Sequence, residues 1–451
     1  MQSIYVLEGM SSLSYTRIKY LAVGSGLLLW GCTGHAVGVE ELQDESLPIS
    51  PAIAPQPVEG VEEVRLEHLK LEVYGESVDL HPAAQQGEYT AEVPMWVSEL
   101  EVRGKGSAGS ELSVNDQLAP SGSASIGLQR GLNRIKVEVN RGEKEQTVYV
   151  DVTRREKVEL VSTLQGPEEA EDFGTSIALS GEYLFVGAPS EDDDKGAVHL
   201  YKRQGENWKE VDQGPLKGVE ESSEFGSSIA VLGERLFVGA PYENSLKGAV
   251  HLYEKQGDSW NKVGEPIKGL EESFGFGMDV AVLGERLFVG APGENEGQGA
   301  VHLYTLEKGN WNSLRVIDGL EKSRFGFSIA VFGERLFVGA PGEDSWTGAV
   351  HFFERDGNAW KEMGKPITGI KEKSQFGARV AAFGENLLVG APGENKDQGV
   401  VRLYAREHGE WNSIESIKGS DEDSVFGQGM AVDAHQLIVG DPKKKAVYIY
   451  H

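Results

Sequence analysis

The sequence has a single cysteine, few basic residues and no long apolar segment. One cysteine among 451 residues excludes a disulfide framework. The 43 Lys and Arg residues are outnumbered by 71 Asp and Glu residues, which gives a formal net charge of −28. Because nucleic-acid binding relies on clusters of Lys and Arg, this charge argues against nucleic acid as a partner.

Helical periodicity is also lacking. Between residues 157 and 451 no stretch carries apolar residues at a sustained helical spacing. Glycine is abundant, at 58 residues, while aromatic residues make up only 8% of the chain. This composition is typical of a turn-rich, all-β protein.

The chain contains six recognisable copies of one sequence motif. The second copy, FGSSIAVLGERLFVGAP, starts at Phe225, and the other copies start at Phe173, Phe276, Phe325, Phe376 and Phe426. Successive starts are 49 to 52 residues apart. Such a period is typical of repeats that cannot bury their own apolar face and therefore stack on their neighbours.

Each repeat predicts four short strands. In the second repeat these are 228–231, 236–238, 248–253 and a segment opened by Trp260, with a tight Gly-Glu turn between the first two. Four strands in about 50 residues suit a β-propeller blade. We therefore predict an all-β chain in which residues 156–451 form a six-bladed β-propeller.

Closure of the ring supports six blades. The sixth repeat ends with an apolar run at 446–450 and has no fourth strand, whereas residues 157–166 form a strand-like segment before the first repeat. An open ring would leave an unpaired strand edge. We predict that the strand at 157–164 completes the last blade.

The N-terminal region predicts export. Arg17 and Lys19 precede about a dozen apolar residues, too few to span a bilayer, as in a signal peptide. Leu29-Trp30-Gly31-Cys32 resembles the bacterial lipobox, although Trp30 stands where a small residue is usual. The resemblance implies a lipoprotein signal segment at residues 1–32, lipidation at Cys32, which becomes the mature N-terminus, and, from Thr33, an outer-membrane lipoprotein; a plain secretory signal and a core cysteine are the alternatives. Met10 is an alternative start.

Two further segments precede the repeats. Residues 33–63 contain several prolines among Glu, Ser and Ala, which predicts a flexible linker. Residues 64–155 contain alternating apolar and polar runs, which predict a small β-sandwich domain. Its segments 112–116, 128–133 and 149–154 resemble the bacterial cadherin-like β-sandwich module.

The Phe-Gly and Gly-Ala-Pro pairs of the repeat resemble the FG-GAP repeat of the integrin α-subunit propeller, and more closely its bacterial branch. Five copies keep Gly-Ala-Pro, and the sixth reads Gly440-Asp441-Pro442. Integrin propellers have seven blades and often hold calcium in an Asp-x-Asp-x-Asp-Gly loop. Here a Gly-Glu turn stands in its place, too short to supply six to eight oxygen ligands, so we expect no metal and no cofactor.

Two residue types recur once per repeat. His199, His251, His302 and His351 share one position, which Arg402 and Tyr448 occupy in the last two repeats. Because equivalent positions on successive blades diverge, we expect a packing or surface role for the histidines and no metal site. For the tryptophans we expect packing between blades, with ligand stacking as the alternative; they are Trp208, Trp260, Trp311, Trp360 and Trp411.

Positions that break the repeat are candidate binding residues. One position on the first strand of the repeat holds Ser176, Ser228 and Ser328 in three repeats. The same position holds Asp279 in the third repeat and Arg379 in the fifth. An acid and a base beside a propeller channel suggest a ligand site, and an ion pair or contact with solvent is the alternative.

Acidic residues are concentrated in loops that a propeller places on one face. We expect this face to attract cationic partners, with simple solubility as the alternative. The candidate ligand-binding acids are Glu243, Glu294, Glu343, Asp344 and Glu394. Further acids in these loops are Glu168, Glu169, Glu171, Asp172, Glu220, Glu221, Glu224, Glu271, Glu272, Glu296, Asp397, Asp421, Glu422 and Asp423.

These observations predict a non-enzymatic, envelope-anchored binding or adhesion protein that uses its loop face for a protein or glycan ligand. The alternatives are a propeller hydrolase or lyase with a channel active site, and a carbohydrate-binding lectin. The sequence contains no Gly-x-Ser-x-Gly and no His-Glu-x-x-His motif, and its cysteine lies in the signal segment.

Overall fold

The computed structural model describes residues 6–9, 18–23, 26–29 and 64–451, except for residues 206, 271, 272, 358 and 423. The chain divides into two compact units, Met1–Ala52 and Ile53–His451. The first unit contains one sheet of three strands, β1 (Val6–Gly9), β2 (Ile18–Val23) and β3 (Gly26–Leu29). Cys32 and the predicted linker at 33–63 lie outside the described residues. A search of the described part for a helix of bilayer-spanning length and hydropathy finds none.

Residues 66–154 form two sheets. The larger has the order β10-β9-β12-β13-β7-β6 and the smaller β11-β8-β4-β5. Apolar residues alternate along β12 and β13 and face one core, as in the pair Val137 and Val148, both buried. The strands are β4 (Leu66–Val73), β5 (Glu76–Val78), β6 (His81–Pro82), β7 (Glu88–Val93), β8 (Glu99–Gly106), β9 (Glu111–Val114), β10 (Gln117–Leu118), β11 (Ser123–Gly127), β12 (Gly131–Arg141) and β13 (Lys144–Arg154).

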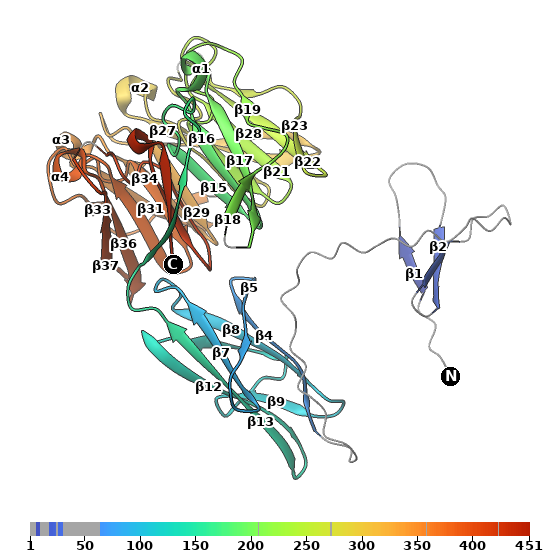
Figure 1. The fold of residues 1–451 in the computed structure, drawn as a ribbon. Coiled ribbons are helices and arrows are strands. Elements are labelled where there is room, and N and C mark those ends of the chain that lie inside the picture. The colour runs from blue at the N-terminus through green and yellow to red at the C-terminus, as the bar shows by residue number, and fades with distance from the viewer. Residues whose placement is uncertain are drawn as a thin grey trace. The chain divides into compact units, whose positions relative to one another are not determined.

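Residues 160–450 form six further sheets (Figure 1). Their strands are β14 (Leu160–Gln165), β15 (Ser176–Ser180), β16 (Tyr183–Ala188), β17 (Ala197–Gln204), β18 (Asn207–Glu210), β19 (Leu216–Lys217), β20 (Ser228–Leu232), β21 (Arg235–Ala240), β22 (Ala249–Gln256), β23 (Ser259–Lys262), β24 (Ile267–Lys268), β25 (Val280–Leu283), β26 (Arg286–Ala291), β27 (Ala300–Glu307), β28 (Asn310–Asp318), β29 (Ser328–Phe332), β30 (Arg335–Ala340), β31 (Ala349–Asp356), β32 (Ala359–Glu362), β33 (Ile367–Thr368), β34 (Arg379–Phe383), β35 (Asn386–Ala391), β36 (Val400–Glu407), β37 (Glu410–Lys418), β38 (Met430–Val432), β39 (Leu437–Asp441) and β40 (Ala446–Tyr450).

The first strands of the six sheets contact one another in a closed order. The order is β15, β20, β25, β29, β34, β38 and back to β15. Within each sheet the later strands follow in sequence, as in β20-β21-β22-β23. The repeat region is therefore all-β, and its sheets are arranged around a common axis.

The last sheet takes its fourth strand from the segment before the first repeat. β14 pairs antiparallel with β40, so that Leu164 lies opposite Val447 and Thr163 opposite Tyr448. Its order is β14-β40-β39-β38. The pairing that the sequence predicts for this segment is confirmed, and it leaves β40 with a partner on both sides.

The two glycine motifs of the repeat meet at each contact between sheets. A Cβ on Gly239, of one Gly-Ala-Pro, would lie 2.0 Å from the carbonyl oxygen of Gly277, of the next Phe-Gly. The sixth motif meets the first in the same way, since a Cβ on Gly440 would lie 1.9 Å from the Gly174 oxygen. Only glycine permits this backbone approach, which explains why both motifs recur.

Residues 66–154 contact the ends of the sheets at which the first and second strands are joined. The Tyr74 ring packs against Phe332 and Phe383, with ring centroids 5.1 Å away in each case. The Trp96 indole donates a hydrogen bond of 2.8 Å to the Asp433 carbonyl oxygen, in the sixth such turn. The opposite end of the sheets carries the loops between the second and third strands and the loops that join one repeat to the next.

Candidate functional site

We call that opposite end the loop face. It comprises the loops between the second and third strands of each repeat and the loops that join one repeat to the next. Four of the former contain a short helical turn: α1 (Glu191–Asp194), α2 (Glu294–Gly297), α3 (Glu343–Trp346) and α4 (Glu394–Asp397); the sixth has the 3₁₀ helix η1 (Pro442–Lys444). Figure 1 shows α1 to α4 along one rim of the repeat region.

Backbone and side-chain hydrogen bonds together join these loops into a continuous belt. The Gly218 amide donates to the Gly196 carbonyl at 2.9 Å, and the Tyr242 amide donates to the Ser223 carbonyl at 3.3 Å. Each loop between repeats thus contacts a loop on either side of it. The Gly166 amide, which donates to the Lys445 carbonyl at 2.8 Å, closes the belt.

The repeated histidines fasten the loops to the sheets. Nε2 of His302 lies 2.7 Å from a carboxylate oxygen of Glu294, and the His302 ring packs edge-on against Phe276 of the Phe-Gly motif. The same contacts recur for His199 with Glu191, for His251 with Glu243 and for His351 with Glu343. The predicted packing role is confirmed, and sequence reasoning missed the Glu partner. A constant spacing of eight residues between Glu and His was the signal.

Charge reinforces these pairs. Burial opposes protonation of His351, but hydrogen bonds to Glu343 and Glu362 outweigh burial and raise its pKa. Burial opposes ionisation of Glu191, but the contact with His199 and the Lys217 charge outweigh it and lower its pKa. Arg402 replaces the histidine in the fifth repeat and reaches Glu394 at 2.7 Å.

The loop acids predicted to bind a ligand therefore fall into two groups. Glu243, Glu294, Glu343 and Glu394 are turned toward the sheets and bonded to His or Arg. Asp344 is exposed on the loop face. Of these five candidates, only Asp344 offers its carboxylate to solvent without such a bond in the described contacts.

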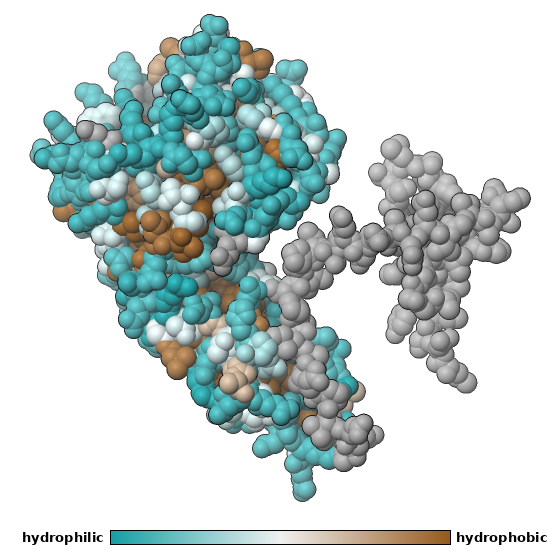
Figure 2. Space-filling view, viewed as in Figure 1, coloured by the Kyte–Doolittle hydropathy of each residue, from teal (hydrophilic) through white to brown (hydrophobic). Residues whose placement is uncertain are grey.

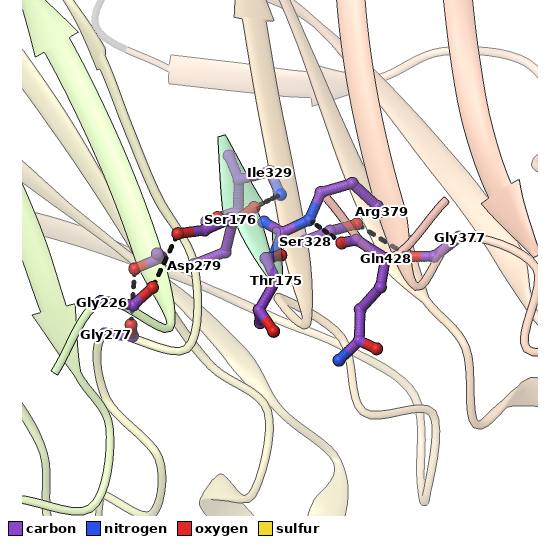
Figure 3. Close-up of polar contacts among 11 residues, drawn as sticks. Thr175, Ser176, Gly226, Gly277, Asp279, Ser328, Ile329, Gly377, Arg379 and Gln428 are labelled. Atoms are coloured by element: carbon purple, nitrogen blue, oxygen red, sulfur yellow. Dashed lines mark hydrogen bonds and ion pairs between the residues drawn. The ribbon is translucent and has the colours of Figure 1, made fainter. Parts of the chain in front are cut away.

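The two residues that break the repeat near the axis meet each other. A guanidinium nitrogen of Arg379 lies 2.7 Å from an Asp279 oxygen, and Asp279 is buried (Figure 3). The other Asp279 oxygen accepts a 2.6 Å hydrogen bond from the Ile329 amide. Burial raises the pKa of Asp279, against the opposing effect of the Arg379 charge.

Arg379 also binds the backbone of two other repeats. Its Nε donates to the Gln428 carbonyl at 2.9 Å, and another guanidinium nitrogen donates to the Thr175 carbonyl at 3.3 Å. Arg379 thereby joins the third, fifth, sixth and first repeats across the axis. Asp279 and Arg379 thus form an ion pair, which was the alternative to a ligand site, and Arg379 uses its hydrogen-bond donors within the chain.

The serines at the equivalent positions are used in the same way. The hydroxyls of Ser176 and Ser328 donate to the carbonyls of Gly226 and Gly377 at 2.7 Å (Figure 3). The Ser228 hydroxyl donates to the Gly277 carbonyl at 2.8 Å. Each acceptor belongs to the Phe-Gly motif of the next repeat. These polar groups therefore hold neighbouring repeats together.

The tryptophans pack between repeats. Trp260 of the second repeat meets Phe185 of the first at 5.2 Å between ring centroids, and Trp311 meets Phe237 at 5.5 Å. Trp360 and Trp411 repeat this contact with Phe288 and Phe337. The prediction of packing between repeats is confirmed for these four residues.

Metal ligands do not converge in the described part of the chain. Within it, no group of three or more His, Cys, Asp or Glu side chains is placed to hold a metal ion. The Gly-Glu turns are two-residue hairpins, as shown by the pairing of Leu232 with Arg235 on either side of Gly233 and Glu234.

The sixth repeat differs at one buried position. Asp441 stands where five repeats have alanine; it is fully buried, and neither carboxylate oxygen has a hydrogen-bond partner of good geometry. Burial raises the pKa of Asp441 to about 6, although Ser424 and the Lys444 backbone and charge lower it in part. The histidine of the other repeats is here Tyr448.

The sequence has relatives among proteins of known function. Residues 165–201 match the family model described as FG-GAP repeat. Integrin alpha-7 of Rattus norvegicus is 32% identical over 152 residues, which is 30% of this chain and 13% of the integrin. Integrin alpha-6 of Homo sapiens is 28% identical over 168 residues, 33% of this chain and 15% of the integrin. The match thus spans about an eighth of the length of these curated relatives.

Two solved structures are also similar. A DUF4623 family protein from Bacteroides eggerthii DSM 20697 has a TM-score of 0.41 at 12% identity, over 86% of this chain and 98% of that chain. YjhT has a TM-score of 0.43 at 13% identity, over 63% and 95%. The family match and the integrin relatives together show that this chain contains an FG-GAP repeat and is similar to integrin α-subunits over about a third of its length.

Proposed function

We propose that this chain is a non-enzymatic binding or adhesion protein. In this proposal, residues 156–451 form a six-bladed β-propeller, residues 64–155 form a β-sandwich that supports it, and the loop face binds a protein or glycan ligand. The main support for the proposal is that the two ends of the sheets differ. One end contacts residues 66–154, and the other end carries the exposed acidic loops.

The contacts at the axis favour binding over catalysis. A catalytic site needs groups that are free to exchange protons or to contact a substrate. Asp279 and Arg379 bind each other, and the serine hydroxyls bind backbone carbonyls of the next repeat. The tryptophans that a lectin would offer to a sugar are packed against phenylalanines.

The charge of the loop face suits a binding role. Glu220, Glu221, Glu296 and Asp344 are exposed there. Grouped acids raise the local concentration of cationic partners and speed their association. Glycans and proteins with basic surfaces are therefore the ligands to be tested first.

We also propose that the chain is anchored in a bacterial envelope, as an outer-membrane lipoprotein lipidated at Cys32. The lipobox-like residues before Cys32 and the proline-containing segment at 33–63 support this proposal. Metabolic labelling with a fatty acid tests it directly. We expect label in the natural chain and none in Cys32→Ser; equal labelling of both would contradict lipidation at this residue.

A ligand screen tests the binding role. The Cys32→Ser chain, which remains soluble if lipidation is the anchor, is applied to protein and glycan arrays. Binding to the best ligand is then compared in two triple variants that change the net charge equally. One reverses loop-face acids (E221K, E296K and D344K), and the other reverses acids in the Gly-Glu turns at the opposite end (E234K, E285K and E334K).

We expect the loop-face variant to lose at least about tenfold in affinity, and the turn variant to change by less than about twofold. Loss of binding only in the turn variant would overturn the assignment of the binding face. Turnover of any array component would overturn the non-enzymatic role.

A further inference from the structure

The acidity of the loop face is confined to one half of the ring. The loops of the first three repeats, within residues 166–172, 190–195, 218–224, 242–247, 269–275 and 293–298, contain 16 acids and two bases, Lys195 and Lys247. The corresponding loops of the last three repeats, within residues 319–324, 342–347, 369–375, 393–398, 419–425 and 443–445, contain nine acids and eight bases. We call these the acidic half and the mixed half.

The structure shows the consequence for individual groups. In the mixed half the bases meet acids: Lys396 lies 2.9 Å from Glu422, and Lys444 lies 2.7 Å from Asp421. In the acidic half acids crowd together. Burial raises the pKa of Glu224, and the charges of Asp194 and Asp172 raise it further. The acidic half therefore carries negative charge that the two bases of its loops do not neutralise.

Large apolar side chains are exposed within the same loops. One repeat position, directly after the glycine that starts each loop between repeats, holds Val219, Leu270, Leu320 and Ile370, which are 62% to 81% exposed. In the view of Figure 2, the repeat region is mainly hydrophilic, with separate hydrophobic groups among the teal ones. Isolated exposed aliphatic residues are ordinary, but a group of them marks an interaction surface.

Such a group exists in the acidic half. Leu270 and Phe274, 66% and 47% exposed, belong to one loop, and the Phe274 ring lies 6.3 Å from that of Tyr242. Leu246, 48% exposed, accepts a backbone hydrogen bond from Gly275 at 3.2 Å. We call Tyr242, Leu246, Leu270 and Phe274 the apolar patch.

Acids surround this patch. Glu220 accepts a 3.0 Å hydrogen bond from the Asn244 amide, beside Tyr242, and the Glu224 charge raises the pKa of Tyr242 after burial, the larger cause. Glu296 is exposed in the following loop. The patch therefore combines exposed apolar area with negative charge.

The mixed half contains a similar arrangement in which the chain itself supplies the cation that contacts the apolar side chain. Trp346 occupies the position equivalent to Leu246, and the Arg324 guanidinium lies over its ring, 4.5 Å from the centroid. In the acidic half no arginine occurs in the loops at all. The Arg324 charge reaches the apolar patch and opposes the rise in the pKa of Tyr242 that burial causes, but its guanidinium lies over Trp346. A cation bound over the apolar patch would therefore come from another molecule.

We propose that the apolar patch and its acids bind a segment of a partner protein in which Arg or Lys alternates with large apolar residues. The charge favours this partner over a nucleic acid or an anionic membrane, whose phosphates the acids repel. The inference rests on the proposed binding role of the loop face. It assigns binding to the acidic half and specifies a ligand with basic and apolar side chains.

Three labelled 12-residue peptides serve as probes for the Cys32→Ser chain: alternating Arg and Leu, alternating Arg and Gly, and alternating Glu and Leu. Fluorescence anisotropy measures their affinities at several salt concentrations. We expect the Arg-Leu peptide to bind at least about tenfold more tightly than the Arg-Gly peptide, because two apolar side chains are buried. We expect no binding of the Glu-Leu peptide.

Matched variants locate the binding. Leu270→Ser with Phe274→Ser is expected to abolish the preference for Arg-Leu over Arg-Gly. Leu320→Ser with Ile370→Ser, which changes equally exposed aliphatic residues in the mixed half, is expected to leave it within about twofold. Glu221→Gln with Glu296→Gln is expected to weaken both Arg peptides and to flatten the salt dependence.

Equal affinity for the Arg-Leu and Arg-Gly peptides, or equal effects of the two serine variants, would overturn this inference. The array ligand separates that failure from failure of the proposed function. If its binding survives the serine change in the acidic half and is lost on E221K, E296K and D344K, the loop face remains the binding surface and only the inferred chemistry is wrong.

Discussion

Replacing Asp441 by alanine should stabilise the protein, by an amount that depends on pH. The substitution restores the Gly-Ala-Pro of the other five repeats at a fully buried position. Neither carboxylate oxygen has a good hydrogen-bond partner, so little is lost with the side chain. A buried carboxylate without such partners destabilises the folded state when it is ionised.

The magnitude follows from the pKa. Burial raises the pKa of Asp441 to about 6, from about 3.9 in an unfolded chain. The folded state therefore binds the proton more tightly, and the stability contributed by protonation is complete below about pH 4 and is lost as the pH rises to about 6. One pKa unit corresponds to about 1.4 kcal/mol, and the nearby Lys444 charge and solvent reduce the sum, so we expect about 1 to 3 kcal/mol.

Denaturant unfolding of the natural chain, Asp441→Ala and Asp441→Asn at pH 4 to 8 measures this difference. We expect both variants to match the natural chain near pH 4 and to exceed it increasingly up to about pH 6.5, with a plateau above. Comparison at each pH cancels the contributions of the other acids. A gain that is independent of pH, or a loss of stability at pH 8, would refute the reasoning.

Three further predictions concern the ring. Gly239→Ala should cost about 2 to 4 kcal/mol in denaturant unfolding, because its Cβ would lie 2.0 Å from the Gly277 oxygen, whereas Gly127→Ala, with nothing within 4 Å, should be nearly neutral; equal costs would refute the proposed role of the motif. Arg379→Met should cost about 3 to 5 kcal/mol by leaving Asp279 unpaired and buried, and adding Asp279→Asn should recover part of it; purely additive losses would argue against the pair. Replacing residues 160–164 by Gly and Ser should speed hydrogen exchange of the β40 amides to the rate of an edge strand, and unchanged protection would contradict the pairing with β14.

Much of the fold was predictable because its signals are local. Alternation of apolar residues and the Gly-Glu turns fix strands and hairpins within a few residues, as in the pairing of Leu232 with Arg235. The pairing of β14 with β40 spans most of the chain, yet it could be predicted because one strand was missing from the last repeat and one was in excess before the first. The approach of Gly239 to Gly277 needed the structure, since it depends on how two repeats pack.

The candidate site was less predictable. The sequence shows that Glu243 lies in an acidic loop, but it does not show the direction of the Glu243 side chain. A run of left-handed residues at 244–246 turns the loop so that this side chain reaches His251. Asp279 and Arg379 are 100 residues apart, and sequence reasoning left open whether they meet a ligand or each other. The apolar patch escaped notice because Leu270 and Phe274 resemble ordinary core residues until their exposure is known.

The most direct test of the proposed binding face is an experimental structure of the chain bound to the best ligand from the arrays. We expect the ligand to contact the loops that contain Leu246, Leu270 and Glu296, with no contact to the Gly-Glu turns. A ligand seated on residues 66–154 or between Asp279 and Arg379 would contradict this expectation.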